Sequence, residues 1–113
     1  MISIEITRDS NNQVTAISAL GHANYGEYGE DIICSAVTAV ITTAMAALED
    51  LLGVEHKRRL DDGHVALALT KKRENPATAE QTGLLLESCV LGLKQIEYSY
   101  GNEYLCVSDP KDR

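Results

Sequence analysis

Hydrophobic and polar residues alternate strictly at the start of the chain. Ile2, Ile4 and Ile6 are separated from one another by single polar residues. A period of two predicts a β-strand with one buried face. The run at 9–12, Asp-Ser-Asn-Asn, favours a turn, because Asn and Asp tolerate left-handed backbone and form local hydrogen bonds. The strand pattern resumes at 14–20, so the first twenty residues predict a β-hairpin.

A long stretch without charged residues follows at 32–48. It is shorter than the roughly 20 apolar residues that a membrane span needs, and it contains Ser and Thr residues. We therefore expect a helix that is buried on most sides and no association with a membrane. Asp31 stands where an N-cap or first-turn acid is favourable. The helix is expected to run to about Leu52, with Gly53 as its left-handed C-terminal cap.

The second half of the chain repeats this order of elements. Two strand-like runs, Val54–Leu60 and His64–Lys71, flank Asp61-Asp62-Gly63, and Asp-Gly between such runs predicts a second hairpin. A second helix is expected to begin at Asn75-Pro76, because Pro is tolerated in the first turn of a helix.

The second helix has an apolar stripe and a clear end. The stripe recurs at helical spacing and consists of Leu85, Cys89, Leu93 and Ile96. Gly101 is its expected stop, and Glu103–Val107 is predicted to form a short last strand. The charged C-terminal tail is expected to fray.

The predicted order ββαββαβ indicates an α+β fold. Hairpins give a mainly antiparallel sheet, and two amphipathic helices would cover one face of it in a two-layer arrangement. The length of 113 residues fits one domain spanning 1–113.

The net charge of −7 excludes some classes of function. A dedicated nucleic-acid binder needs a basic face to meet phosphates, and so does a protein that binds an anionic membrane surface. The acidic excess permits a basic partner without requiring one.

The cysteines indicate a reduced protein. An odd count of three, at positions 34, 89 and 106, is not a disulfide framework, and their spacing to the histidines does not suggest a zinc site. Cys89 fits the core, and Cys106 fits the core or the edge of the last strand. The N-terminal residues lack the pattern of a signal peptide, so we expect a cytoplasmic protein without a metal or cofactor.

Cys34 is the candidate nucleophile. It lies near a helix start, where unpaired amides and the helix dipole stabilise a thiolate and can serve as oxyanion donors. His22, across the glycine-rich loop 21–30, is the candidate base. The alternative is that Cys34 is an inert small hydrophobic residue.

Other residues of this region have two interpretations each. The acids around Cys34 oppose formation of a thiolate. Asp31 either orients the imidazole of His22 or caps the helix. Thr38, one turn beyond Cys34, either touches the site or bonds back to the helix. Tyr25 and Tyr28 either line a substrate groove or pack on the surface.

The segment 21–40 resembles the signature of the bacterial ribosomal-processing cysteine proteases, the Prp family. That pattern runs from Gly-His-Ala through a glycine-rich loop to Asp, two aliphatic residues, Cys and a small residue. The matching positions are Gly21, His22, Ala23, Gly26, Gly29, Asp31 and Cys34.

The resemblance implies a cysteine endopeptidase that removes a short N-terminal extension from a large-subunit ribosomal protein. It implies that His22 and Cys34 form the catalytic dyad and that Gly21 and Asp31 support it. Tyr25, Gly26, Tyr28 and Gly29 would belong to the substrate loop. Thr38 stands where the family often has Ser.

The resemblance also implies a homodimer, to whose interface the helix at 32–48 would contribute. Two other functions remain open from the sequence. One is a non-catalytic ribosome-assembly module that binds the same ribosomal protein, and the other is a different thiol hydrolase, such as an acyl-transfer enzyme, that uses the same dyad.

Overall fold

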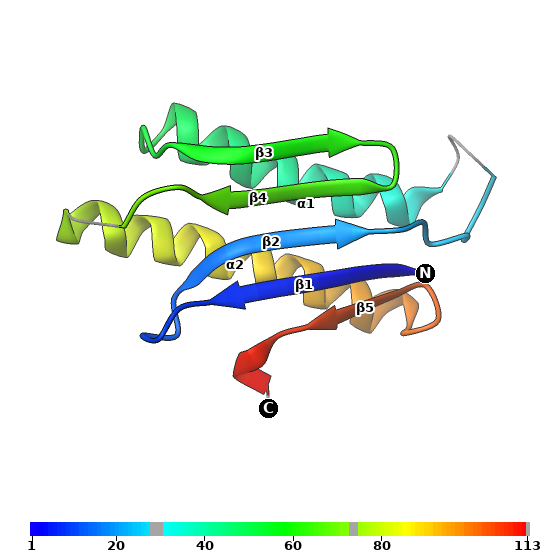
Figure 1. The fold of residues 1–113 in the computed structure, drawn as a ribbon. Helices are drawn as coiled ribbons and strands as arrows, with labels where there is room; N and C mark the ends of the chain where they lie inside the picture. The colour runs from blue at the N-terminus through cyan, green and yellow to red at the C-terminus, as the bar shows by residue number, and fades with distance from the viewer. Residues whose placement is uncertain (28–30, 73–74, 113) are drawn as a thin grey trace.

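The computed structural model of the protein describes residues 1–27, 31–72 and 75–112. Its elements, in chain order, are β1 (Ile2–Arg8), β2 (Val14–Leu20), α1 (Ile32–Asp50), β3 (His56–Asp61), β4 (His64–Leu69), α2 (Pro76–Tyr100), β5 (Leu105–Ser108) and a 3₁₀ turn (Pro110–Asp112). This order confirms the predicted ββαββαβ arrangement and the α+β class (Figure 1).

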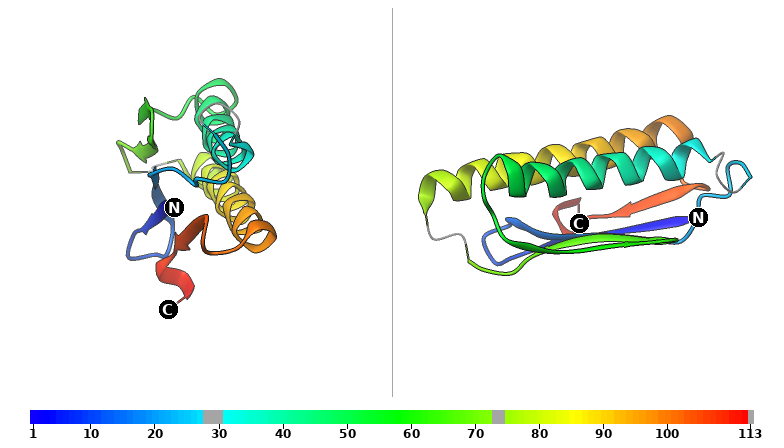
Figure 2. Two further views of the ribbon diagram at one scale, coloured as in Figure 1. Left: turned by 90° about the vertical axis from the view of Figure 1, so that its right-hand side faces the viewer. Right: turned by 90° about the horizontal axis from the view of Figure 1, so that it is seen from above.

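The five strands form one sheet in the order β3-β4-β2-β1-β5. Neighbouring strands are antiparallel except β1 and β5, which run parallel. The sheet is therefore mixed. The helix α2 connects β4 to β5 and brings the chain back to the end of the sheet where β1 begins, so that β5 runs parallel to β1. Both helices lie on one face of the sheet (Figure 2).

The core lies between the sheet and the two helices. The three isoleucines of β1 are buried and the residues between them are exposed, as the alternating pattern predicts. Burying one such side chain contributes about 1.5–3 kcal/mol. By length and composition α1 could cross a membrane, but it packs here with one stripe in this core. That stripe consists of Ile33, Val37, Ile41, Ala44, Met45 and Leu48.

Two strand starts differ from the prediction for local reasons. The amide of Val54 donates to the carbonyl of Leu48 at 2.8 Å, so Val54 closes the end of α1 instead of opening β3. The amide of Tyr104 donates to the carbonyl of Gly101 at 3.2 Å, so a turn delays the start of β5.

Residues 109–112 of the C-terminal tail are held against the rest of the fold, so the expectation that the tail frays is wrong for them. Asp109 is buried, and its carboxylate accepts hydrogen bonds from Nε of Arg8 at 2.7 Å and from Nζ of Lys94 at 2.8 Å. Arg8 also forms a bidentate ion pair with Glu87 on α2, in which its two terminal nitrogens each donate to one carboxylate oxygen at 2.9 Å. The tail is thus tied to β1 and α2 by charge.

This network shifts the protonation of its members. The guanidinium of Arg8, with help from Lys94, holds the pKa of Asp109 well below its ordinary value despite burial. A depressed native pKa gives stability that is fully present above the unfolded value of about 3.9. That stability is lost as the pH falls through the lower native value.

We expect Arg8→Met to lower the free energy of unfolding by about 3 kcal/mol, because it leaves the buried carboxylate of Asp109 without its main partner. Arg59→Met is the control. Its ion pair with Asp61 is exposed on both sides, so it should cost at most about 1 kcal/mol. Urea unfolding at neutral pH measures both, and equal losses in the two variants would contradict a stabilising role for the Arg8 network.

Candidate active site

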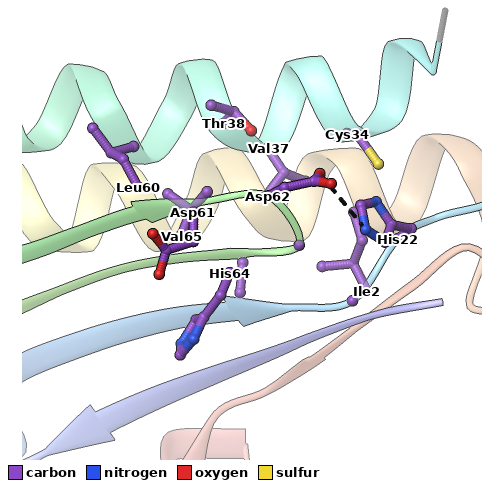
Figure 3. A pocket seen from close by; sticks show the side chains of 13 residues that line it. Ile2, His22, Cys34, Val37, Thr38, Leu60, Asp61, Asp62, His64 and Val65 are labelled. Carbon is purple, nitrogen blue, oxygen red and sulfur yellow. Dashed lines mark ion pairs between the residues drawn. The ribbon is translucent and has the colours of Figure 1, made fainter. Parts of the chain in front are cut away.

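Cys34 and His22 lie together at one end of the sheet. Cys34 is in the first turn of α1 and is half-buried, and His22 follows β2 and is exposed. Both side chains line the cavity of about 250 Å³ that Figure 3 shows, and both also line an adjoining cavity of about 460 Å³. The fold therefore brings the two residues to one site, although they are separated by the loop.

The backbone at Gly21 directs the chain from β2 into this site. Its φ of +102° is in the region that favours glycine, and an added Cβ would lie 2.5 Å from the carbonyl oxygen of Met1. Its amide donates to the carbonyl of Gly63 at 2.8 Å. The positive φ and the close approach of the Met1 carbonyl thus require glycine at this position.

Asp31 caps α1. One carboxylate oxygen accepts from the amides of Ile33 at 3.0 Å and Cys34 at 3.1 Å, and the other accepts from the amide of Tyr25 at 3.0 Å. Burial opposes ionisation, but these amides hold the pKa of Asp31 below its ordinary value. Of the two roles considered for Asp31, the geometry is that of the cap.

The environment of Cys34 favours the thiol over the thiolate. Burial raises the pKa of Cys34, and the charge of Asp31 and its hydrogen bond with the thiol raise it further. The amide of Ala23 donates to Sγ at 3.4 Å and works in the opposite direction. The lowering that a helix start would give is therefore outweighed here.

Three amides of the first helical turn are already engaged. Those of Ile33 and Cys34 bond to the side chain of Asp31, and that of Ser35 donates to its carbonyl oxygen at 3.1 Å. Their predicted use as oxyanion donors would require breaking the cap. The amide of Ala23 donates to the sulfur and therefore lies where an oxyanion donor is needed, near the reacting atom.

Two residues beside His22 were not recognised as site residues from the sequence. The Oδ1 atom of Asp62 lies 3.7 Å from Nε2 of His22 (Figure 3). A Cβ at Gly63 would lie 2.9 Å from the same nitrogen, so the ring packs against this glycine. The sequence identified both residues as a hairpin turn, and no local signal linked that turn to His22.

The remaining predicted residues are near the site in different ways. Thr38 lines the smaller cavity, and Gly26 lines the larger one. The ring of Tyr25 packs edge-to-face on Tyr100 and Tyr104, with centroids 5.6 and 5.0 Å apart. Its aromatic contacts are therefore with other tyrosines. Tyr28 and Gly29 lie outside the described residues.

Comparison with known proteins identifies relatives of this chain. The sequence model of the family described as "Cysteine protease Prp" matches residues 1–105. The ribosomal processing cysteine protease Prp of Bacillus subtilis (strain 168) is 31% identical over 101 residues, which cover 88% of this chain and 90% of the relative.

Solved structures agree with the sequence match. The essential ribosomal processing protease Prp from S. aureus, in complex with a covalently linked product peptide, superposes with a TM-score of 0.82 at 29% identity. The match covers 96% of this chain and 98% of that one. The same S. aureus protease with a substrate peptide gives a TM-score of 0.77 at 28% identity, with the same coverage.

We expect Asp31→Asn to make Cys34 more reactive at a given pH. The amide side chain keeps an oxygen for the cap but removes the negative charge that opposes the thiolate. The rate of iodoacetamide labelling against pH, with Cys34 distinguished from the exposed Cys106 by peptide mass, should show a lower midpoint than wild type.

Asp31→Ala is the matched control, because it removes the charge and the cap together. It should also lower the midpoint, with a loss of about 1 kcal/mol in unfolding free energy from the missing cap. A midpoint in Asp31→Asn equal to or above the wild-type value would show that the charge of Asp31 does not govern the thiol.

Proposed function

This chain belongs to the Prp family of cysteine proteases, and from that premise we propose that it removes a short N-terminal extension from a large-subunit ribosomal protein. Cys34 is the proposed nucleophile and His22 the proposed base. The observation that carries the proposal is that these two side chains line the same pair of cavities, at the end of a fold shared with peptide-bound proteases. Membership in a protease family favours this function over a non-catalytic binding module or another thiol hydrolase.

The proposed reaction starts from the thiol of Cys34, whose pKa is raised by burial and by the charge of Asp31. His22 takes the thiol proton as sulfur attacks the carbonyl carbon of the scissile bond. When the C–N bond breaks, His22 gives that proton to the leaving amine and an acyl-thioester remains on Cys34. Water, deprotonated by His22, then hydrolyses the thioester and restores the thiol.

The cavities suggest what kind of peptide binds. The smaller cavity has an apolar wall beside Cys34, made of Ile2, Ala19, Val37, Leu60 and Val65. This wall suits an apolar side chain close to the scissile bond. The net charge of −7 suits a basic substrate such as a ribosomal protein, whose approach it would steer.

We expect Cys34→Ala and His22→Ala each to abolish cleavage of a synthetic peptide that spans the N-terminal extension, because one removes the nucleophile and the other the proton acceptor. Product masses from mixing peptide and purified protein measure this. Cys106→Ala, a change of an exposed cysteine on β5, should cleave like wild type. Full activity in either dyad variant would overturn the assignment.

We further propose that the protein acts in the cytoplasm as a homodimer. Its cysteines are free, which suits a reducing compartment and a thiol enzyme. The outer face of the helices supports self-association. On α2, Leu84, Leu91 and Tyr98 recur every seven residues and are 72%, 61% and 89% exposed. Beside Leu84, a groove of about 710 Å³ runs between α1 and α2 with a mainly apolar lining.

A second copy would cover this face if the two helix pairs met about a twofold axis, because one apolar surface then matches itself. We expect Leu84→Glu to shift the protein toward monomers in sedimentation velocity runs at micromolar concentration. Thr7→Glu adds the same charge on the exposed face of β1 and should leave the association state unchanged. A wild-type monomer, or a dimer that survives Leu84→Glu, would contradict this interface.

A further inference from the structure

We propose that Asp62, in the turn between β3 and β4, is a positioning residue for His22. The inference rests on the proposed function, in which His22 is the base. It adds a third member to the dyad from a part of the chain that is distant in sequence. Asp62 acts through the imidazole and does not itself touch the reacting atoms.

The contact depends on the register of the sheet. β2 and β4 pair so that Leu20 lies opposite His64. The segment after β2 carries His22, and the segment before β4 carries Asp62. Both segments therefore lie at the same end of the sheet. The hydrogen bond from the amide of Gly21 to the carbonyl of Gly63 fixes the two segments at 2.8 Å.

Gly63 allows the ring to come close. Because a Cβ at this position would lie 2.9 Å from Nε2, any larger residue would push the imidazole away. The carboxylate of Asp62 then lies 3.7 Å from Nε2, within ion-pair distance but longer than a hydrogen bond of about 3 Å. Catalytic contacts of this kind commonly tighten when substrate binds.

The contact selects which nitrogen of His22 does the chemistry. When Nε2 carries the proton and faces Asp62, Nδ1 is the nitrogen left to accept the proton of the Cys34 thiol. After transfer, both nitrogens are protonated and the ring is cationic. The carboxylate of Asp62 stabilises that cation at the step where charge develops.

The other charged groups of this region have different partners. Among the described residues, Asp31 directs its carboxylate to the amides and thiol at the start of α1. Asp61 pairs with Arg59. The amino group of Met1 contributes a weak positive field at Cys34. Asp62 is thus the carboxylate paired with the ring of His22, which is why its removal should be specific.

The size of the effect follows from exposure. The side chains of His22 and Asp62 are 47% and 66% exposed, and an exposed ion pair is worth up to about 1 kcal/mol, or about fivefold in rate. A bound peptide that covers the cavities would exclude water and strengthen the pair. We therefore expect Asp62→Asn to lower kcat about fivefold to tenfold, with KM within about twofold of wild type.

The pH–rate profile separates positioning from a structural effect. Asp62→Asn removes the carboxylate charge that lies beside Nε2 of His22, whereas Asp62→Glu retains a carboxylate at this position. The acid limb of kcat/KM should move to lower pH in Asp62→Asn and stay in place in Asp62→Glu, which keeps the charge. Asp61→Asn, a change of the neighbouring carboxylate at the end of β3, is the matched control and should leave the acid limb where it is in wild type.

Two results with the extension peptide would overturn the proposal. One is a wild-type kcat and an unmoved acid limb in Asp62→Asn, while His22→Ala is inactive; the proposed function would then stand without Asp62. The other is the same loss in Asp62→Asn and Asp61→Asn with no shift of the acid limb, which would indicate a general effect on the turn.

If the wild-type protein does not cleave the peptide, the proposed function fails and labelling of Cys34 with iodoacetamide decides the positioning role. A less well oriented His22 should then accept the thiol proton less readily, so labelling between about pH 6 and 8 should be slower in Asp62→Asn than in Asp61→Asn. This difference should vanish when His22 is replaced by Ala in both. Equal labelling rates, or a difference that persists without His22, would overturn the proposal.

Discussion

The cap that Asp31 places on α1 is the interaction on which the geometry of the site depends. One carboxylate holds the amides of Tyr25, Ile33 and Cys34, so it joins the loop to the first helical turn. Without it, the loop and the helix start would lose a common anchor, and an N-cap is typically worth about 1 kcal/mol. The same carboxylate puts a negative charge beside the sulfur. The residue that orders the site therefore also opposes ionisation of the Cys34 thiol.

A second constraint comes from the sheet. The site is built where the end of β2 lies beside the start of β4, and the glycines at 21 and 63 let their backbones approach. One of them abuts the carbonyl of Met1 and the other the ring of His22. The N-terminus, the loop after β2 and the turn after β3 thus meet in one place. Three distant segments of the chain contribute to a site whose two central residues are only twelve positions apart.

The parts of this structure that follow from local pattern were predictable, and the parts that follow from pairing between distant strands were not. The alternation of isoleucines in β1, the cap position of Asp31 and the Pro at the start of α2 are short-range signals, and the elements appear where they indicate. The motif around Cys34 and His22 supplied the family. By contrast, nothing near Asp62 indicates that its turn lies beside His22, because the pairing of β2 with β4 decides this. The burial of Asp109 was missed for the same reason, since its partner Arg8 lies at the other end of the chain.

The balance of forces at Cys34 explains why a third residue matters. A helix N-terminus favours an anion, whereas burial and the charge of Asp31 raise the pKa of Cys34. The environment of the sulfur therefore favours the thiol over the thiolate. An enzyme of this kind depends on how well its base is oriented and how strongly the imidazolium is stabilised once the proton moves. The carboxylate beside His22 acts at that point of the reaction, whereas Asp31 acts against it. The two aspartates of the proposed site thus have different roles, since Asp31 orders the helix that presents the sulfur and Asp62 supports the proposed base.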